Sequence, residues 1–233
     1  MKTVLTTLCI LAVATMALAE KPVIPSGDWT PARIACPFEV VTYDWDFAQG
    51  DQGFTTSVCD DTGGAPVWAH GTDANFPATV WGTVLNGDYI SDAGEALVSP
   101  EFMVDTSTNL VQVTHFFEFE NSYDGGNLMV NGTVVAPMDG YNDDELSDSV
   151  NYYAFCVDGQ PGLTDDPLVP YEMITSCFDL SAFEGETVSL EFQFGSDSSV
   201  TYLGWYLGGV KVGGTEPVGT TDASWDAMKA LYR

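Results

Sequence analysis

Apolar and polar residues alternate with a period of two along most of the chain. In segment 187–194 every second residue is apolar, and segment 111–119 repeats the pattern with Phe116 as its one interruption. This period is typical of strands that turn one face to a core and the other to solvent. The other segments predicted as strands are 38–47, 80–85, 96–104, 127–135, 152–157, 173–180 and 204–212.

Turn signals separate these segments. Each signal is a pair in which Asn, Asp or Glu precedes Gly, and such pairs favour the backbone conformations of tight turns. They stand at Asn86-Gly87, Asp124-Gly125, Asn131-Gly132 and Glu184-Gly185. Many short strands with regular turns and almost no helical period predict an all-β fold, namely a two-sheet antiparallel jelly-roll β-sandwich with a short C-terminal helix.

The start of the chain carries an export signal. Lys2 precedes an apolar run at 4–17 and the small residues Ala17 and Ala19, a pattern that predicts a signal peptide cleaved before Glu20. The run is shorter than the about 20 residues that span a bilayer. We therefore expect a secreted or cell-surface protein without a transmembrane segment in the mature chain. Its expected parts are a signal peptide at 1–19, an N-terminal extension at 20–37, the sandwich domain at 38–213, and a linker with a helical tail at 214–233.

The tail is predicted to end in a short helix. Trp225, Met228 and Tyr232 fall on one helical face. Because isolated helices shorter than about 12 to 15 residues are marginal in water, something must cover this face. We favour docking on the chain's own domain, which needs no second molecule. The alternative is an attachment signal.

The chain is strongly acidic, with 34 Asp and Glu against 6 Lys and Arg and a formal net charge of −28. Nucleic acid and anionic membranes need clustered basic residues, so both are excluded as partners. Cationic partners and divalent metals stay open. The simplest interpretation is an acidic surface that keeps an exported protein soluble.

Four cysteines follow the signal peptide: Cys36, Cys59, Cys156 and Cys177. An even number in an exported chain predicts two disulfides, and the lack of close pairs argues against zinc. Three connectivities exist. We favour Cys36–Cys59 with Cys156–Cys177, because each bond then closes a local loop of about 20 residues and stabilises the fold by about 3 kcal/mol.

Candidate catalytic groups are few. Of the two histidines, His115 lies on the apolar face of its segment and is interpreted as a core residue, while His70 follows no known motif. Glycoside hydrolysis needs a pair of carboxylates. Glu118 and Glu120 would lie about 7 Å apart on one strand face, but alternation turns that face to solvent. No catalytic residue is therefore predicted.

Four sequence blocks resemble a known group of domains. They are 46–47 through 53–57; 81–83 through 88–89 to 97–100; 117–120 with 123–126; and 178–185 running on to 196–197 and 204–206. In this order they are similar to the MAM-like jelly-roll domains, including the choice-of-anchor J type and the β-sandwich that accompanies immune inhibitor A metalloproteases. The resemblance spans about 44–212 and implies a jelly-roll sandwich. Such domains commonly carry two acidic residues after the Gly-Trp-Tyr run, where this chain has Gly208 and Gly209.

A structural calcium site is the one cofactor that the sequence suggests. Oxygen ligands suit this ion, and it ties loops together in many exported proteins. The nominated ligands, taken from the matching blocks, are Asp46, Asp51, Glu120 and Asp124. Gly208 and Gly209 weigh against the site, because the acidic pair that would complete it is missing.

The resemblance implies a secreted, non-catalytic binding or adhesion module whose ligand is an extracellular glycan or protein. Trp68, Trp81 and Tyr141 are candidates for stacking on sugar rings, although each also suits core packing. Two alternatives remain. One is a glycoside hydrolase that uses the carboxylate pair, and the other is a structural component of a surface or secreted assembly.

Overall fold

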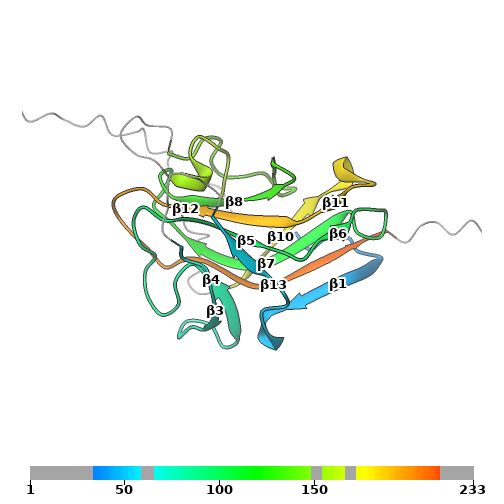
Figure 1. Ribbon diagram of the computed structural model, residues 1–233, viewed down its shortest axis with the longest axis horizontal. Helices are drawn as coiled ribbons and strands as arrows, with labels where there is room; N and C mark the ends of the chain where they lie inside the picture. The colour runs from blue at the N-terminus through cyan, green and yellow to red at the C-terminus, as the bar shows by residue number, and fades with distance from the viewer. Residues whose placement is uncertain (1–33, 59–65, 148–153, 166–171, 216–233) are drawn as a thin grey trace, which may run out of the picture.

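Two antiparallel sheets pack face to face in the computed structural model (Figure 1), which describes residues 34–58, 66–147, 154–165 and 172–215. The expected all-β sandwich is confirmed. The predicted signal peptide, Cys59 and the helical tail lie outside the described residues. Within the described part, no helix has the length and apolar character needed to cross a bilayer.

The larger sheet has six strands among the described residues. Its order is β10 (Ile174–Asp179), β7 (Leu110–Glu118), β13 (Gly204–Gly214), β4 (Thr79–Gly82) and β3 (Ala69–Thr72), with β1 (Val40–Asp46) paired to β13. All of these pairings are antiparallel. The register of β13 against β7 shifts between Leu207 and Gly209, which leaves Gly208 as a bulge.

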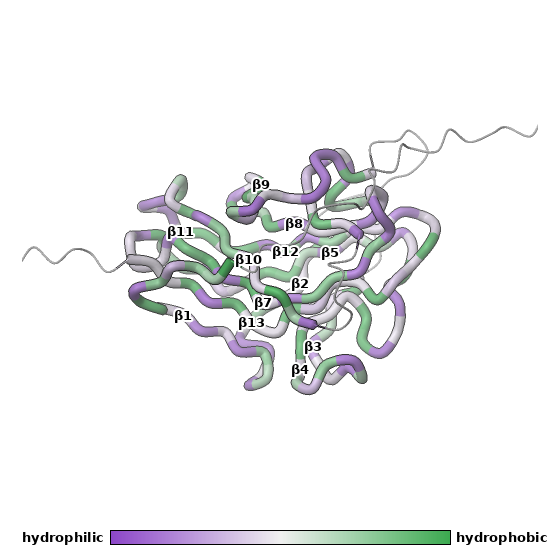
Figure 2. Tube along the Cα trace, turned by 180° about the vertical axis from the view of Figure 1, so that it is seen from behind, coloured by the Kyte–Doolittle hydropathy of each residue, from purple (hydrophilic) through white to green (hydrophobic). Residues whose placement is uncertain are grey.

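The second sheet covers the inner face of the first. Its order is β2 (Thr55–Ser57), β5 (Gly94–Val98), β12 (Leu190–Gly195), β8 (Gly125–Val130) and β9 (Thr133–Val135), and β6 (Phe102–Met103) pairs separately with β11 (Thr187–Val188). Successive long strands pass from one sheet to the other, as in jelly rolls. Figure 2 shows hydrophobic segments mainly in the strands, while much of the connecting loops is hydrophilic.

Most predicted strands are present, with corrected boundaries. Segment 96–104 divides into β5 and β6 around Pro100, which has no N–H to donate to a neighbouring strand. Segment 127–135 divides at Asn131-Gly132, where positive φ angles of 47° and 76° close the β8–β9 hairpin.

One predicted strand is a helix, and two strands were not predicted. The described end of segment 152–157 is a 3-10 helix, η2 (Phe155–Val157), which packs on β12 and β5 from outside the sandwich. Its apolar residues therefore reflect burial against a sheet and not membership in one. The pattern also gave no sign of β2 and β3, which are too short to show a period.

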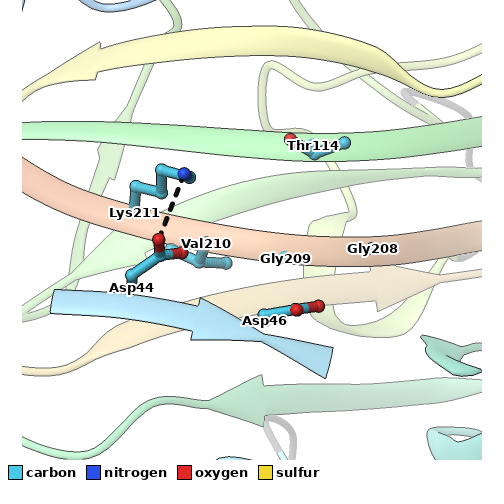
Figure 3. Close-up of a pocket in the computed structure, with 7 residues that line it drawn as sticks. All are labelled: Asp44, Asp46, Thr114, Gly208, Gly209, Val210 and Lys211. Atoms are coloured by element: carbon cyan, nitrogen blue, oxygen red, sulfur yellow. Dashed lines mark ion pairs between the residues drawn. The ribbon is translucent and has the colours of Figure 1, made fainter. Parts of the chain in front are cut away.

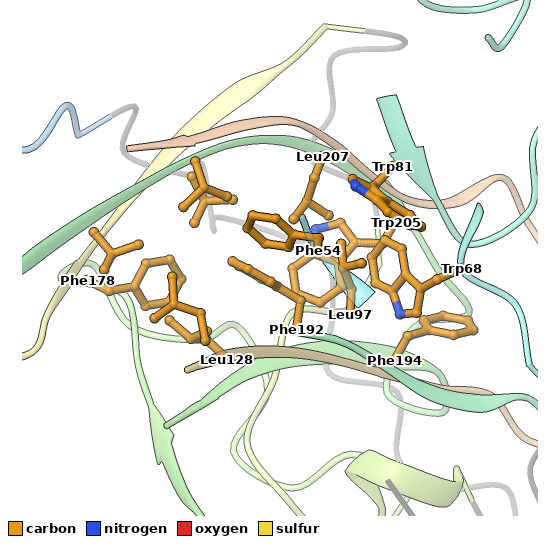
Figure 4. Close-up of a cluster of buried hydrophobic side chains, with 14 of the residues drawn as sticks. Phe54, Trp68, Trp81, Leu97, Leu128, Phe178, Phe192, Phe194, Trp205 and Leu207 are labelled. Atoms are coloured by element: carbon orange, nitrogen blue, oxygen red, sulfur yellow. The ribbon is translucent and has the colours of Figure 1, made fainter. Parts of the chain in front are cut away.

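The core lies between the two sheets and is rich in aromatic residues. Figure 4 shows Trp68, Phe192 and Trp205 packed together between the layers. The Trp205 ring centroid lies 5.8 Å from that of Trp68 and 5.9 Å from that of Phe192. Trp68 and Trp81 are each 7% exposed and belong to this core, so neither is a free platform for sugar. Tyr141 packs against the same core.

The expected apolar face of segment 111–119 is confirmed, and its interruption has a structural explanation. Val111, Val113, His115 and Phe117 are buried in the sandwich. Phe116 points to the opposite face of β7 but is also buried, in a second cluster with Phe76, Val80 and Tyr206. A loop covers the outer face of the larger sheet here, so both faces of β7 are apolar.

The predicted disulfide pairing is wrong. Cys36 is bonded to Cys177, which lies 141 residues further along the chain. Cys156 is also disulfide-bonded. Its partner is not Cys177, because Cys177 is already bonded to Cys36. The Cys36 backbone N–H donates to Gln112 Oε1 at 3.0 Å, and Gln112 lies beside Cys177 in the register of β7 and β10. The segment before β1 is thus fastened across the sheet, and sequence proximity was a poor guide.

Candidate functional site

Three carboxylates converge at one end of the sandwich. Glu120, Asp124 and Asp197 each place a side-chain oxygen within 4.8 Å of the others; we name this group the carboxylate centre. Glu120 and Asp124 lie in the turn between β7 and β8, and Asp197 follows β12. The β12–β13 loop and the segment that joins β4 to β5 curve around this same end in Figure 1.

Backbone hydrogen bonds fix the turn that carries two of the three carboxylates. The N–H groups of Tyr123 and Asp124 both donate to the Glu120 carbonyl, at 3.1 and 3.0 Å. Ser122, at a φ of 64°, donates its N–H to Thr164 Oγ1 at 2.8 Å. The Thr164 hydroxyl in turn lies 2.8 Å from the Asp124 carbonyl oxygen. A residue forty positions away therefore holds the turn in place.

Asp197 is tied directly to Asp124. Its backbone N–H donates to Asp124 Oδ1 at 2.7 Å, and its own Oδ1 accepts the N–H of Ser199 at 2.8 Å. Tyr89 closes the arrangement, since its hydroxyl donates to Asp124 Oδ2 at 2.6 Å and accepts the Glu120 N–H at 3.1 Å. The carboxylate centre thus joins three separate stretches of chain.

Two oxygens of the centre have no hydrogen-bond partner among the described residues. Glu120 Oε2 and Asp197 Oδ2 are both buried and unpartnered. Asp124 is fully buried and Asp197 is 1% exposed, while Glu120 is half-buried. Among the described residues, none of the three makes a salt bridge. Buried carboxylate oxygens without a donor cost free energy, so the arrangement calls for a positive ligand.

Electrostatics agree with the geometry. Burial, followed by the charge of Asp197, raises the pKa of Glu120 to about 7. Burial also raises the pKa of Asp124 to about 8, against the opposing hydrogen bonds from Tyr89 and from the Asp197 N–H. Burial is the main cause of the raised pKa of Asp197, and the charge of Asp92 adds to it. Without a cation, the centre therefore tends to hold protons.

These pKa values predict how the metal-free protein responds to pH. Because folding raises the pKa of Glu120 and Asp124, stability falls as pH rises through their folded values. From about pH 6.5 to 8.5 we expect a loss of about 1 to 2 kcal/mol, allowing for solvent screening of half-buried Glu120. Urea unfolding in EDTA measures this loss, and Asp124→Asn should reduce it. Stability that stays constant or rises over this range would contradict the expectation.

The structure brings together two of the four nominated calcium ligands. Glu120 and Asp124 meet as expected, but Asp46 and Asp51 do not belong to the carboxylate centre. Asp46 caps the 3-10 helix η1 (Phe47–Gln49), accepting the Ala48 N–H at 3.0 Å, and Asp51 accepts the Gly53 N–H at 3.0 Å. Both carboxylates stabilise local turns. Asp197 was not among the nominated residues, although Ser196-Asp197 stands in the fourth matching block.

A shallow groove lies over the bulge of β13 (Figure 3). It encloses about 270 Å³ above Gly208 and Gly209 and is bounded by Asp44, Asp46 and Lys211. Lys211 Nζ lies 3.1 Å from Asp44 Oδ2. Asp44 is paired with Lys211, and the Asp46 carboxylate accepts a backbone N–H of η1. Both acidic groups of the groove therefore already have partners. The groove therefore carries no charge that is left without a partner.

The structure also places the residues that were considered as catalytic groups, His115, Glu118 and Glu120. His115 is fully buried, lies 2.9 Å from Ser176 Oγ through Nε2, and accepts the Trp205 indole N–H at 3.0 Å. Burial lowers its pKa to about 3, so it is a neutral core histidine as expected. Glu118 is the last residue of β7 and Glu120 lies beyond the strand. The expectation that the two share one strand face is therefore wrong.

No protein-family model matches this chain, and no curated protein matches it. The resemblance to MAM-like sandwiches therefore rests on its four sequence blocks alone.

Proposed function

We propose that this protein is an exported, non-catalytic binding or adhesion module whose loops are held by a structural calcium ion at the carboxylate centre. The observation that carries the proposal is the convergence of three carboxylates with buried, unpartnered oxygens on Glu120 and Asp197. Export is supported by the signal-peptide pattern at 1–19.

The donor set favours calcium over other metals. All three side chains offer oxygen, and the centre contains no histidine or cysteine of the kind that zinc and other transition metals prefer. Calcium accepts six to eight oxygens in variable geometry, whereas magnesium demands a near-ideal octahedron and keeps several waters. Carboxylates that differ in burial and come from two loops suit the more tolerant ion.

Burial of the ligands supports a structural role. Asp124 and Asp197 have almost no exposed surface, so a substrate could not reach both. The hydrolase alternative needs two carboxylates on either side of a sugar ring, with space for the ring between them. Binding an ion here would instead fasten the β7–β8 turn to the β12–β13 loop, and through Tyr89 to the segment before β5. The ligand of the module is proposed to be an extracellular glycan or protein.

Calcium is expected to raise the thermal stability of the purified protein. An ion that binds only the folded state adds about 2.7 kcal/mol at a hundredfold excess over its dissociation constant. For a domain of this size that corresponds to about 5 to 10 °C in melting temperature. The measurement compares melting curves in EDTA and in millimolar calcium.

Two variants make this test specific. Asp197→Asn removes a charge from the centre and should abolish most of the calcium-dependent shift. Asp51→Asn is the matched control, because Asp51 is exposed and outside the centre, and asparagine supports the same turn. Equal melting temperatures with and without calcium in the wild-type protein would refute the site.

A further inference from the structure

Three exposed apolar side chains lie on the two loops at the end of the sandwich that carries the carboxylate centre. Among the described residues, the large apolar side chains with the greatest exposure are Val41, Val58, Ile90, Met103, Met138, Val200 and Tyr202. Val200 and Tyr202 belong to the β12–β13 loop, which also contains Asp197, and Ile90 belongs to the β4–β5 segment that is hydrogen-bonded to it. We name these three residues the apolar rim.

Hydrogen bonds hold the two loops side by side. The Tyr89 N–H donates to the Tyr202 carbonyl at 2.8 Å, and the Ser196 hydroxyl donates to the Ile90 carbonyl at 2.8 Å. Further along, the Asp92 N–H donates to the Asp197 carbonyl at 2.7 Å. The same pair of loops therefore carries both the apolar rim and one ligand of the centre.

Core packing does not account for the rim. Val200 has a φ of 36°, a left-handed conformation that β-branched residues rarely adopt, and its side chain is 50% exposed. Tyr202 is 39% exposed and Ile90 is 45% exposed. Apolar side chains held in solvent by a hydrogen-bonded loop pair are a surface suited to a ligand.

The centre has room for oxygen atoms from outside the protein. Three carboxylates supply between three and six oxygens, and calcium takes six to eight. The Tyr89 hydroxyl is already engaged with Asp124 and with the Glu120 N–H. Glu120 is the one half-buried residue of the three, although its unpartnered Oε2 is itself buried, so we place the open coordination positions on its side.

The charge of the centre decides which kind of ligand oxygen can complete the calcium coordination. Three ionised carboxylates with one calcium ion leave a net negative centre, on a chain whose formal charge is −28. A carboxylate or phosphate ligand would add repulsion, whereas a hydroxyl would not. Neutral sugars offer neighbouring hydroxyl groups on one edge and a face of C–H groups that packs on aromatic and aliphatic side chains.

We propose that this end of the sandwich binds a neutral glycan, with two neighbouring hydroxyls completing the calcium coordination and the sugar ring packed on the apolar rim. The inference rests on the calcium site proposed above and names the ligand class of the module. It makes Tyr202 the main packing contact and Glu120 the ligand nearest to the sugar.

The test probes the purified protein with an array of neutral mannose-, fucose- and galactose-terminated oligosaccharides, in millimolar calcium and in EDTA, below the melting temperature of both forms. We expect binding in calcium alone. Tyr202→Ser should weaken it about tenfold while leaving the calcium-dependent melting shift unchanged. Met103→Ser is the matched control, because Met103 is 58% exposed on β6, outside the rim.

The outcomes separate the two proposals. A calcium-dependent melting shift without glycan binding overturns the glycan inference alone, as does glycan binding that persists in EDTA or that keeps its full strength in Tyr202→Ser. Binding of acidic oligosaccharides without binding of the neutral ones also overturns it, as does a purified polypeptide that binds when none of the glycans does. A melting temperature that is the same in EDTA and in calcium overturns the calcium site itself.

Discussion

Replacing both Cys36 and Cys177 by alanine is expected to lower the free energy of unfolding by about 4 to 5 kcal/mol. The bond joins residues separated by 141 positions, and the loss of chain entropy on closing such a loop is of this order. Alanine is preferred to serine because both side chains are buried, at 8% and 0% exposed. Since whole domains are stable by about 5 to 15 kcal/mol, the loss would be a large part of the total.

Urea unfolding of the oxidised wild type and the double variant measures this loss. A chemical check accompanies it, because proteolysis without reductant should yield one fragment that links the Cys36 and Cys177 peptides. Val41→Ala, at an exposed position of β1, is the control and should change stability by less than about 0.5 kcal/mol. A fragment that links Cys36 to a cysteine other than Cys177 would contradict the structure.

Trp205→Ala is expected to cost about 4 kcal/mol, because removing a buried aromatic side chain leaves a cavity as well as losing its contacts. Trp205 is 1% exposed and packs on Trp68 and Phe192. Gly126 on the facing sheet makes room for it, since a Cβ there would lie 2.5 Å from the Trp205 ring. The indole N–H also donates to His115 Nδ1, which would be left buried without its donor.

Equilibrium unfolding at neutral pH measures this cost. Trp205→Phe keeps most of the ring volume and loses the N–H, so its smaller cost separates packing from the hydrogen bond. A loss below about 1 kcal/mol for Trp205→Ala would show that neighbouring side chains collapse into the space. That result would contradict the central place given to this residue in the core.

Much of the fold was readable from the sequence because strand alternation is local. The faces of β7 and β12 follow from every second residue, and the turn at Asn131-Gly132 follows from two residues that accept positive φ. Where the pattern misled, a second layer was responsible. Phe116 is buried by a loop over the outer face of the larger sheet, and the apolar residues of η2 are buried against β12.

Two of the three residues of the carboxylate centre were equally readable from the sequence. Glu120 and Asp124 are four residues apart and share one turn, so their proximity needs no knowledge of the fold. Asp46 and Asp51 were grouped with them on the basis of matching blocks, yet short side chains beside a turn bond first to their own backbone.

The sequence by itself determined the β-sandwich class, the buried face of its central strand, the core position of His115 and one turn of the carboxylate centre. Tertiary structure alone decided the Cys36–Cys177 bond and the arrival of Asp197 beside Asp124, 73 residues away. The physical reason is the same in both cases. Strand period and turn chemistry act over a few residues, whereas the sheet order that brings β12 beside β8 and β10 beside β7 depends on burying whole apolar faces together.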